Sequence, residues 1–185
     1  MLRKINIFIL TAIIWLGVVS FNDSSNKVEI PGKKINRAIS KIWKVEDFEV
    51  IDLNNKKNCM ANGRWLKVKT NGSNLGMIYI GRVNSCRSGG CSIDGDPQSL
   101  AFEFFDYFLL ADTSGKILWV KVFNYQATQG HEVMSRGWLN QFKGLTKDEK
   151  LVFGQDIEAI SGATVSASAI TEDIQQVLSC VTAFD

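Results

Sequence analysis

The residues with the clearest chemical potential form a short run of small and hydroxyl side chains, Ile160-Ser-Gly-Ala-Thr-Val-Ser-Ala-Ser168. Small residues let a ligand approach the backbone closely. Apolar residues with helical spacing follow the run and predict a terminal amphipathic helix that starts near Thr164. A helix N-terminus offers unpaired N–H groups and a partial positive charge, which together suit an anion such as a phosphate. The Thr164 hydroxyl on the first turn is expected beside that phosphate.

A simpler role for the same residues stays open. Ser and Thr at the start of a helix are most often caps, whose side-chain oxygens accept hydrogen bonds from the first free N–H groups. Taken alone, the segment therefore supports two interpretations, a phosphate site and a capped helix.

The first 21 residues predict a signal peptide or a short membrane anchor. Arg3 and Lys4 precede an apolar run from Ile7 to Phe21, and small residues lie near its end, as in a secretory signal. The run is shorter than the roughly 20 residues that cross a bilayer, and a buried core helix is the alternative. Residues 22–30 are polar and predict a linker. We therefore expect an extracytoplasmic protein, either periplasmic or membrane-anchored with its domain outside.

The four cysteines are Cys59, Cys86, Cys91 and Cys180. An even number in an exported protein favours disulfides. The Gly-rich turn between Cys86 and Cys91 favours a local bridge, which would leave Cys59 to pair with Cys180. A redox-active dithiol and a four-cysteine metal site are the alternatives, but Cys59 and Cys180 lack the paired spacing of a zinc site. We expect no metal, and the single histidine, His131, rules out a site with several histidines in one chain.

Length and charge narrow the class of protein further. A chain of 185 residues predicts one domain with a tail, and we assign that domain to residues 31–185. Lys and Arg number 21 against 19 Asp and Glu, and Arg3 and Lys4 account for the excess. The rest of the chain has no net charge and no basic run, which argues against nucleic acid as the main partner.

The periodicity predicts an α+β fold, with a mostly antiparallel central sheet flanked by N- and C-terminal helices. Besides the terminal helix, we expect one helix from Pro31 to Trp43 and another over residues 132–143, stopped by Gly144. Alternating or β-branched runs predict strands at 48–53, 64–70, 75–83, 102–111 and 116–123, of which the last two form a hairpin.

The run Ser161-Gly162-Ala163-Thr164, followed by Val165-Ser166, resembles the flavinylation motif of the FMN-binding domain family. That family includes the C subunit of the sodium-translocating NADH:quinone oxidoreductase and the G subunit of the Rnf electron-transport complex. Residues 115–123, 126–131 and 138–144 also resemble the family's strand and the segments after it. The resemblance covers about residues 75–180, with order and spacing intact.

The chain departs from the family pattern in three places. Glu158 stands six residues before the threonine, where the family often has Asp. Ala127 and Gln129 stand in a loop that commonly reads Glu-Thr-Pro-Gly, which predicts altered contacts to a flavin ring there. The Cys86/Cys91 loop is not part of the subunits' common pattern and indicates a separate branch.

The resemblance implies FMN joined through its phosphate to the Thr164 hydroxyl by an FAD:protein FMN transferase, which uses FAD and Mg²⁺. It implies that Thr128 and Gly130 line the flavin ring. His131 is a further candidate near the flavin or a partner, with a structural role as the alternative, and Tyr125 and Trp138 either stack on the ring or belong to the core. The remaining motif residues expected to bind the cofactor are Ser161, Gly162, Ala163, Val165 and Glu158.

These features lead us to expect an exported electron-transfer flavoprotein that shuttles electrons between a membrane redox complex and another carrier. We assign it no catalytic residues, since an electron carrier fits better than a stand-alone enzyme. One alternative is an extracytoplasmic flavin-dependent reductase of a small acceptor. Another is a disulfide-stapled binding module without flavin, in which the motif only caps a helix, and a non-covalent FMN binder lies between these.

Overall fold

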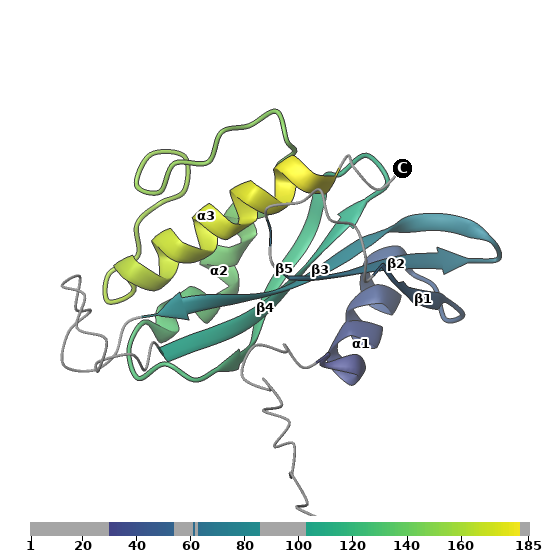
Figure 1. Cartoon of the computed structure of the whole chain (residues 1–185), viewed down its shortest axis with the longest axis horizontal. Coiled ribbons are helices and arrows are strands. Elements are labelled where there is room, and N and C mark those ends of the chain that lie inside the picture. The colour runs from purple at the N-terminus through teal and green to yellow at the C-terminus, as the bar shows by residue number, and fades with distance from the viewer. Residues whose placement is uncertain (1–29, 54–60, 62, 86–102, 182–185) are drawn as a thin grey trace, which may run out of the picture.

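The computed structural model describes residues 30–53, 61, 63–85 and 103–181. Within them, five strands form one antiparallel sheet in chain order, with helices on both of its faces (Figure 1). The strands are β1 (Glu49–Asp52), β2 (Arg64–Thr70), β3 (Ser73–Ser85), β4 (Glu103–Asp112) and β5 (Ile117–Tyr125). The helices are α1 (Gly32–Trp43), α2 (Arg136–Leu139), α3 (Thr164–Val181) and the short 3-10 helices η1 (His131–Met134) and η2 (Asn140–Phe142). The predicted α+β class is confirmed.

The long central pair β3 and β4 fixes the geometry of the sheet. Their register runs without interruption from Gly76 opposite Asp112 to Ser85 opposite Glu103. The predicted hairpin of β4 and β5 is also present, and it turns at Asp112–Gly115, where Gly115 has a φ of 85°. Ser85 at the end of β3 and Glu103 at the start of β4 therefore lie side by side at one end of the sheet.

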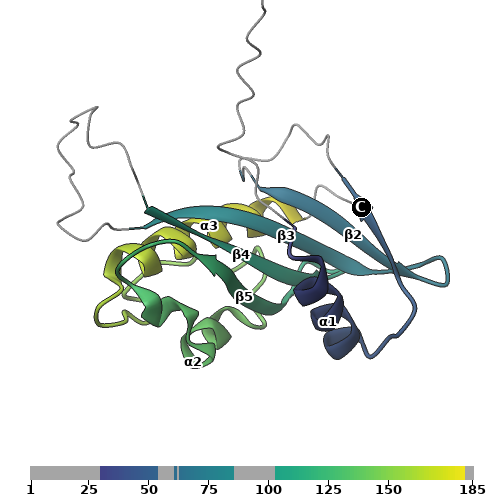
Figure 2. The same cartoon turned by 90° about the horizontal axis from the view of Figure 1, so that it is seen from below.

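Helices α3 and α1 lie on opposite faces of the sheet (Figures 1 and 2). Side chains alternate between the two faces along each strand, so β3 serves both cores. Met77, Tyr79 and Val83 belong to the cluster that contains α3. Ile78 and Ile80 belong to the cluster that contains α1.

Helix α3 packs through the apolar stripe that its sequence predicts. The side chains that fill the stripe are all buried: Ile170, Ile174, Val177, Leu178 and Val181. Removing a side chain of this size from water contributes about 1.5–3 kcal/mol, so this stripe is the main force that holds α3 on the sheet.

The predicted single helix over residues 132–143 is wrong. The segment is divided into η1, α2 and η2, because Ser135 adopts an extended backbone with φ −64° and ψ 131°. Its hydroxyl accepts a hydrogen bond from the N–H of Trp138 at 3.4 Å, so Ser135 caps α2 and interrupts the helix. The predicted stop at Gly144 holds, since its φ of 94° suits glycine.

Several predictions from the sequence fall outside the described residues. These are the signal or anchor at residues 1–21, nearly all of the linker, and Cys59, Cys86 and Cys91. Among the described helices, none has the length and apolar character needed to cross a membrane.

A polar cluster lies between α3 and the sheet. Asp173 of α3 accepts a hydrogen bond from the Tyr107 hydroxyl at 2.5 Å and one from the Tyr79 hydroxyl at 3.4 Å. Burial raises the pKa of Asp173, and the two hydrogen bonds only partly offset this effect. Gly81 leaves room for the cluster, because a Cβ there would lie 2.9 Å from the Asp173 carboxylate.

Replacing Asp173 tests this cluster through the pH dependence of stability. Because the folded-state pKa is raised above its ordinary value of 3.8, wild-type stability decreases as pH rises from that value through the folded-state pKa. Asp173→Asn keeps an acceptor but cannot ionise, so it should gain stability relative to wild type between about pH 3.5 and about pH 7. Urea unfolding at both pH values measures the difference.

Asp173→Ala is the control for the loss of the acceptor. It removes the acceptor of both tyrosine hydroxyls and should cost about 1–3 kcal/mol. A difference between wild type and Asp173→Asn that stays constant with pH would contradict the assigned pKa direction.

Candidate functional site

Among the residues that the structure describes, no side chain caps the N-terminus of α3. The first intrahelical bond runs from the N–H of Ala167 to the carbonyl of Ala163 at 2.8 Å, which makes Ala163 the N-cap residue. Alanine has no side-chain oxygen, so the capped-helix interpretation of the motif is wrong at this position. In the described part of the chain, no side chain accepts a hydrogen bond from the N–H groups of Thr164, Val165 or Ser166.

The motif presents Thr164 to solvent. Ser161, Gly162 and Thr164 are exposed, and Val165 is 44% exposed, whereas Ala163 is buried beneath them. The chain turns sharply here, with a φ of 83° at Gly162 and a bond from the Ala163 N–H to the Ile160 carbonyl at 3.2 Å. The Thr164 hydroxyl is therefore on an accessible first turn.

Contacts with α2 and η2 hold the segment that leads into the motif. The Trp138 indole N–H donates to the Glu158 carbonyl at 2.7 Å, and the Glu158 N–H donates to the Gln141 side chain at 2.8 Å. The side chain of Glu158 is exposed. Trp138 is buried and lies edge-on to Phe142, with ring centroids 5.3 Å apart. The sequence left two roles open for Trp138, stacking on the flavin ring and packing in the core, and the structure places it in the core.

The loop over residues 126–131 contacts the first turn of α3. Gly130 has a φ of 85°, and a Cβ there would clash with the Ser166 hydroxyl and lie 2.9 Å from the Tyr125 hydroxyl. Ser166 is 1% exposed and is hydrogen bonded to Ser85 at 2.6 Å. The structure thereby brings together two predicted segments, the 126–131 loop and the motif, at the end of the sheet where β3 finishes.

Tyr125 and Thr128 are both engaged within the protein. The Tyr125 ring stacks on Phe105 at 5.3 Å and contacts the exposed His131 ring at 4.5 Å. Thr128 is exposed, but its N–H and hydroxyl both donate to the Glu103 carboxylate, at 2.6 and 2.8 Å. Tyr125 thus helps to hold the 126–131 loop in place.

Three residues lie at the site although no sequence pattern predicted them there. Ser85 and Glu103 come from neighbouring strand ends, and the exposed Glu132 of η1 lies beside Gly162, whose Cβ would be 3.2–3.4 Å from the carboxyl group. None of them lies near Thr164 in the chain. Only the pairing of β3 with β4 and the docking of α3 reveal their proximity.

The residues present fit a phosphate attached at Thr164. The fit rests on the uncapped N–H groups of the first turn, which lack a protein acceptor among the described residues. These groups and the helix dipole favour a negatively charged group. The small residues Gly162 and Ala163 leave the approach to them open.

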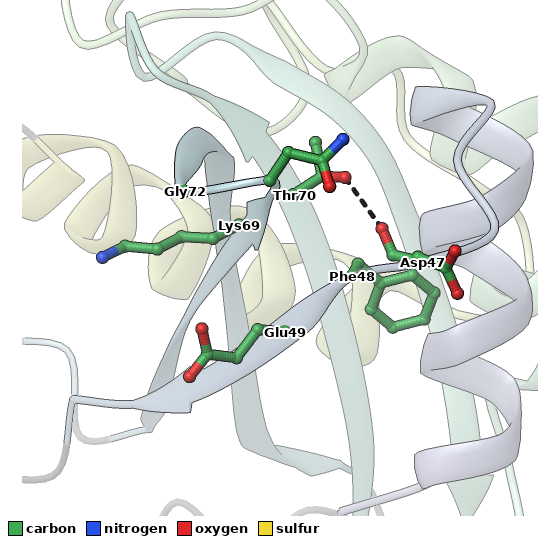
Figure 3. A pocket seen from close by; sticks show the side chains of 7 residues that line it. Asp47, Phe48, Glu49, Lys69, Thr70 and Gly72 are labelled. Atoms are coloured by element: carbon green, nitrogen blue, oxygen red, sulfur yellow. Dashed lines mark hydrogen bonds between the residues drawn. The ribbon is translucent and has the colours of Figure 1, made fainter.

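A separate pocket of about 270 Å³ lies by the β2–β3 turn, lined by Asp47–Glu49 and Lys69–Gly72 (Figure 3). Thr70 donates to the Asp47 carbonyl there at 2.8 Å. Strand β3 runs from this turn to Ser85, and at about 3.3 Å per residue its length is roughly 40 Å. The pocket is therefore remote from Thr164.

Cys180 lies at the opposite end of α3 from the motif. It is 4% exposed, and the structure has no free cysteine among the described residues. Sixteen helical steps separate Cys180 from Thr164, which corresponds to about 24 Å. Cys180 is thus not part of this site, and its predicted pairing with Cys59 stays a prediction.

Residues 106–179 match the family model of the FMN-binding domain. The match begins in β4 and ends in α3, so it includes the 126–131 loop and Thr164. The resemblance to the FMN-binding domain family is thereby confirmed for this region. It supports a flavin-binding electron-transfer protein with FMN as its cofactor. No curated protein matches the chain significantly.

Glycine substitutions test the contact between the loop and α3. Gly130→Ala combines an unfavourable positive φ, worth about 1–2 kcal/mol, with a clash against Ser166. Overpacking adds about 1–3 kcal/mol, so we expect a total loss of at least about 2 kcal/mol in the free energy of unfolding.

Two other glycines separate these contributions. Gly154 has a φ of 82° and nothing within 4 Å of an added Cβ, so Gly154→Ala should show the backbone cost alone. Gly137 in α2 has neither problem, and Gly137→Ala should be neutral or stabilising by up to about 1 kcal/mol. Equal losses for Gly130→Ala and Gly154→Ala in urea unfolding would show that the contact with Ser166 is loose.

Proposed function

We propose that this protein is an exported electron-transfer flavoprotein that carries FMN in a phosphoester bond to Thr164. The observation that carries the proposal is the exposed Thr164 on a helix N-terminus that no described side chain caps, within the region that matches the FMN-binding domain. An FAD:protein FMN transferase is the partner that would form the bond, by moving the FMN part of FAD to the Thr164 hydroxyl while the pyrophosphate bond breaks and AMP leaves. The electron donor and acceptor are proposed as a membrane redox complex and a second carrier.

The protein's own residues would hold the cofactor at two points. The N–H groups of the first turn of α3 would bind the phosphate oxygens, and Gly162 would allow them to approach. Thr128 and Gly130 in the neighbouring loop would line the ring. When bound, FMN supplies one- and two-electron chemistry through its isoalloxazine ring, which the phosphate tether leaves free.

A covalent tether suits a protein outside the cytoplasm. Attachment makes docking of the ring intramolecular, so occupancy does not depend on free cofactor. This argument links the proposed bond to the export predicted for residues 1–21. The proposed disulfides, Cys86 with Cys91 and Cys59 with Cys180, belong to the same oxidising location.

The intact mass of residues 22–185 tests the proposal after co-expression with an FAD:protein FMN transferase. Wild type should gain the mass of FMN less one water, and Thr164→Ala should gain nothing. Ser168→Ala is the matched control, because Ser168 is a hydroxyl residue one turn further along α3 and should leave the gain intact. Peptide mapping then assigns the added mass to the segment around Thr164.

Other outcomes distinguish the alternatives. A wild-type protein without added mass and without yellow colour after denaturation refutes the covalent bond. Added FMN that binds to such a protein indicates a non-covalent flavoprotein, and no binding indicates a module without flavin. Turnover of a small oxidant by the loaded protein, without any partner, would favour a reductase over a carrier.

A further inference from the structure

We infer that Glu103 and Tyr125 are positioning residues of the flavin site, which hold the 126–131 loop in place beside the helix that carries Thr164. This inference rests on the proposed function, because it concerns how the same site presents its ring. Neither residue belongs to the motif or to the loop itself. They act from the ends of the two neighbouring strands β4 and β5.

Glu103 anchors the loop through Thr128. One oxygen of its carboxylate accepts both the Thr128 backbone N–H at 2.6 Å and the Thr128 hydroxyl at 2.8 Å. Bonds to an ionised acceptor are stronger than those between neutral groups. The Thr128 backbone is therefore fixed to the first residue of β4.

Tyr125 anchors the next turn of the loop. Its hydroxyl donates to the Gln129 carbonyl at 2.5 Å and lies 3.4 Å from the Ser166 hydroxyl of α3. Its ring is held by the stacked Phe105, which is fully buried. The hydroxyl thus joins the loop and the first turn of α3 at the point where Gly130 leaves no room for a side chain.

The loop needs such anchors because its own sequence is permissive. Gly130 has wide backbone freedom because it has no side chain. Gln129 also leaves the backbone freer than a proline at that position would, because proline fixes φ. Two further backbone bonds hold the two ends of the loop: the Gln126 N–H donates to the Phe104 carbonyl at 2.9 Å, and the Val133 N–H donates to the Gly130 carbonyl at 3.3 Å. The contacts of Glu103 and Tyr125 hold the middle of the loop, at Thr128 and Gln129, between these two ends.

The chain offers a matched control for Glu103. Glu149 accepts the N–H of Thr146 at 2.8 Å and also the Thr146 hydroxyl, which is the same arrangement in a different turn. The test compares wild type, Glu103→Ala, Tyr125→Phe and Glu149→Ala. Each protein is prepared both without flavin and loaded by the transferase, and intact mass verifies the loading.

Two measurements are made on each protein. Amide hydrogen exchange of the flavin-free protein reports the anchoring of the loop, and iodide quenching of flavin fluorescence reports the exposure of the ring in the loaded protein. Loss of one such hydrogen bond should raise the open population of the loop by roughly fivefold. Glu103→Ala and Tyr125→Phe should therefore show faster exchange over residues 126–131 and stronger quenching, whereas Glu149→Ala should match wild type in both.

Three results would overturn the inference. The first is unchanged exchange in both variants, and the second is unchanged quenching in variants that carry FMN. The third is a Glu149→Ala protein that changes as much as Glu103→Ala, since the effect would then be unspecific. Failure of the proposed function has a different signature, namely a wild-type mass without FMN.

Discussion

Helix α3 lies on the sheet through an unbroken stripe of buried aliphatic side chains, and the position of Thr164 follows from that packing. The stripe fixes the rotation of the helix about its axis, so its first turn has only one orientation relative to the strands. Ser166 then faces inward to Ser85, while Thr164 and Val165 remain outside. An apolar contact that is non-directional in itself therefore determines which hydroxyl is buried and which is presented.

Each face of the sheet also holds a hydrogen-bonded carboxylate that makes the packing specific, half-buried on the α3 face and fully buried on the other. On the α3 face, Asp173 receives the hydroxyls of Tyr79 and Tyr107. On the other face, the fully buried Asp106 binds Arg82 at 2.7 Å and Asn124 at 2.7 Å, each from a neighbouring strand. A misaligned strand would leave such a charge without partners, at a high cost in free energy. Helix α3 and the strand register are thus restricted by polar as well as apolar contacts.

The site forms where the ends of three segments of the fold meet. Strand β3 finishes at Ser85, β5 leads into the 126–131 loop, and α3 begins at Thr164. The family match starts only in β4, yet β3 contributes Ser85 and pairs with β4 along its whole second half. Residues outside the matched region are therefore part of the structure that supports the proposed cofactor.

The sequence by itself determined the helices at both ends, the strand alternation, the β4–β5 hairpin and the start of the last helix at Thr164, because these depend on local periodicity and turn residues. It predicted one helix where Ser135 divides the segment, since both states satisfy the same apolar pattern. Only the tertiary structure decided that Ala163 is the N-cap, that Trp138 is a core residue, and that Glu103 reaches Thr128. These facts depend on contacts between residues far apart in the chain, whose geometry is set by strand pairing and helix docking rather than by any local pattern.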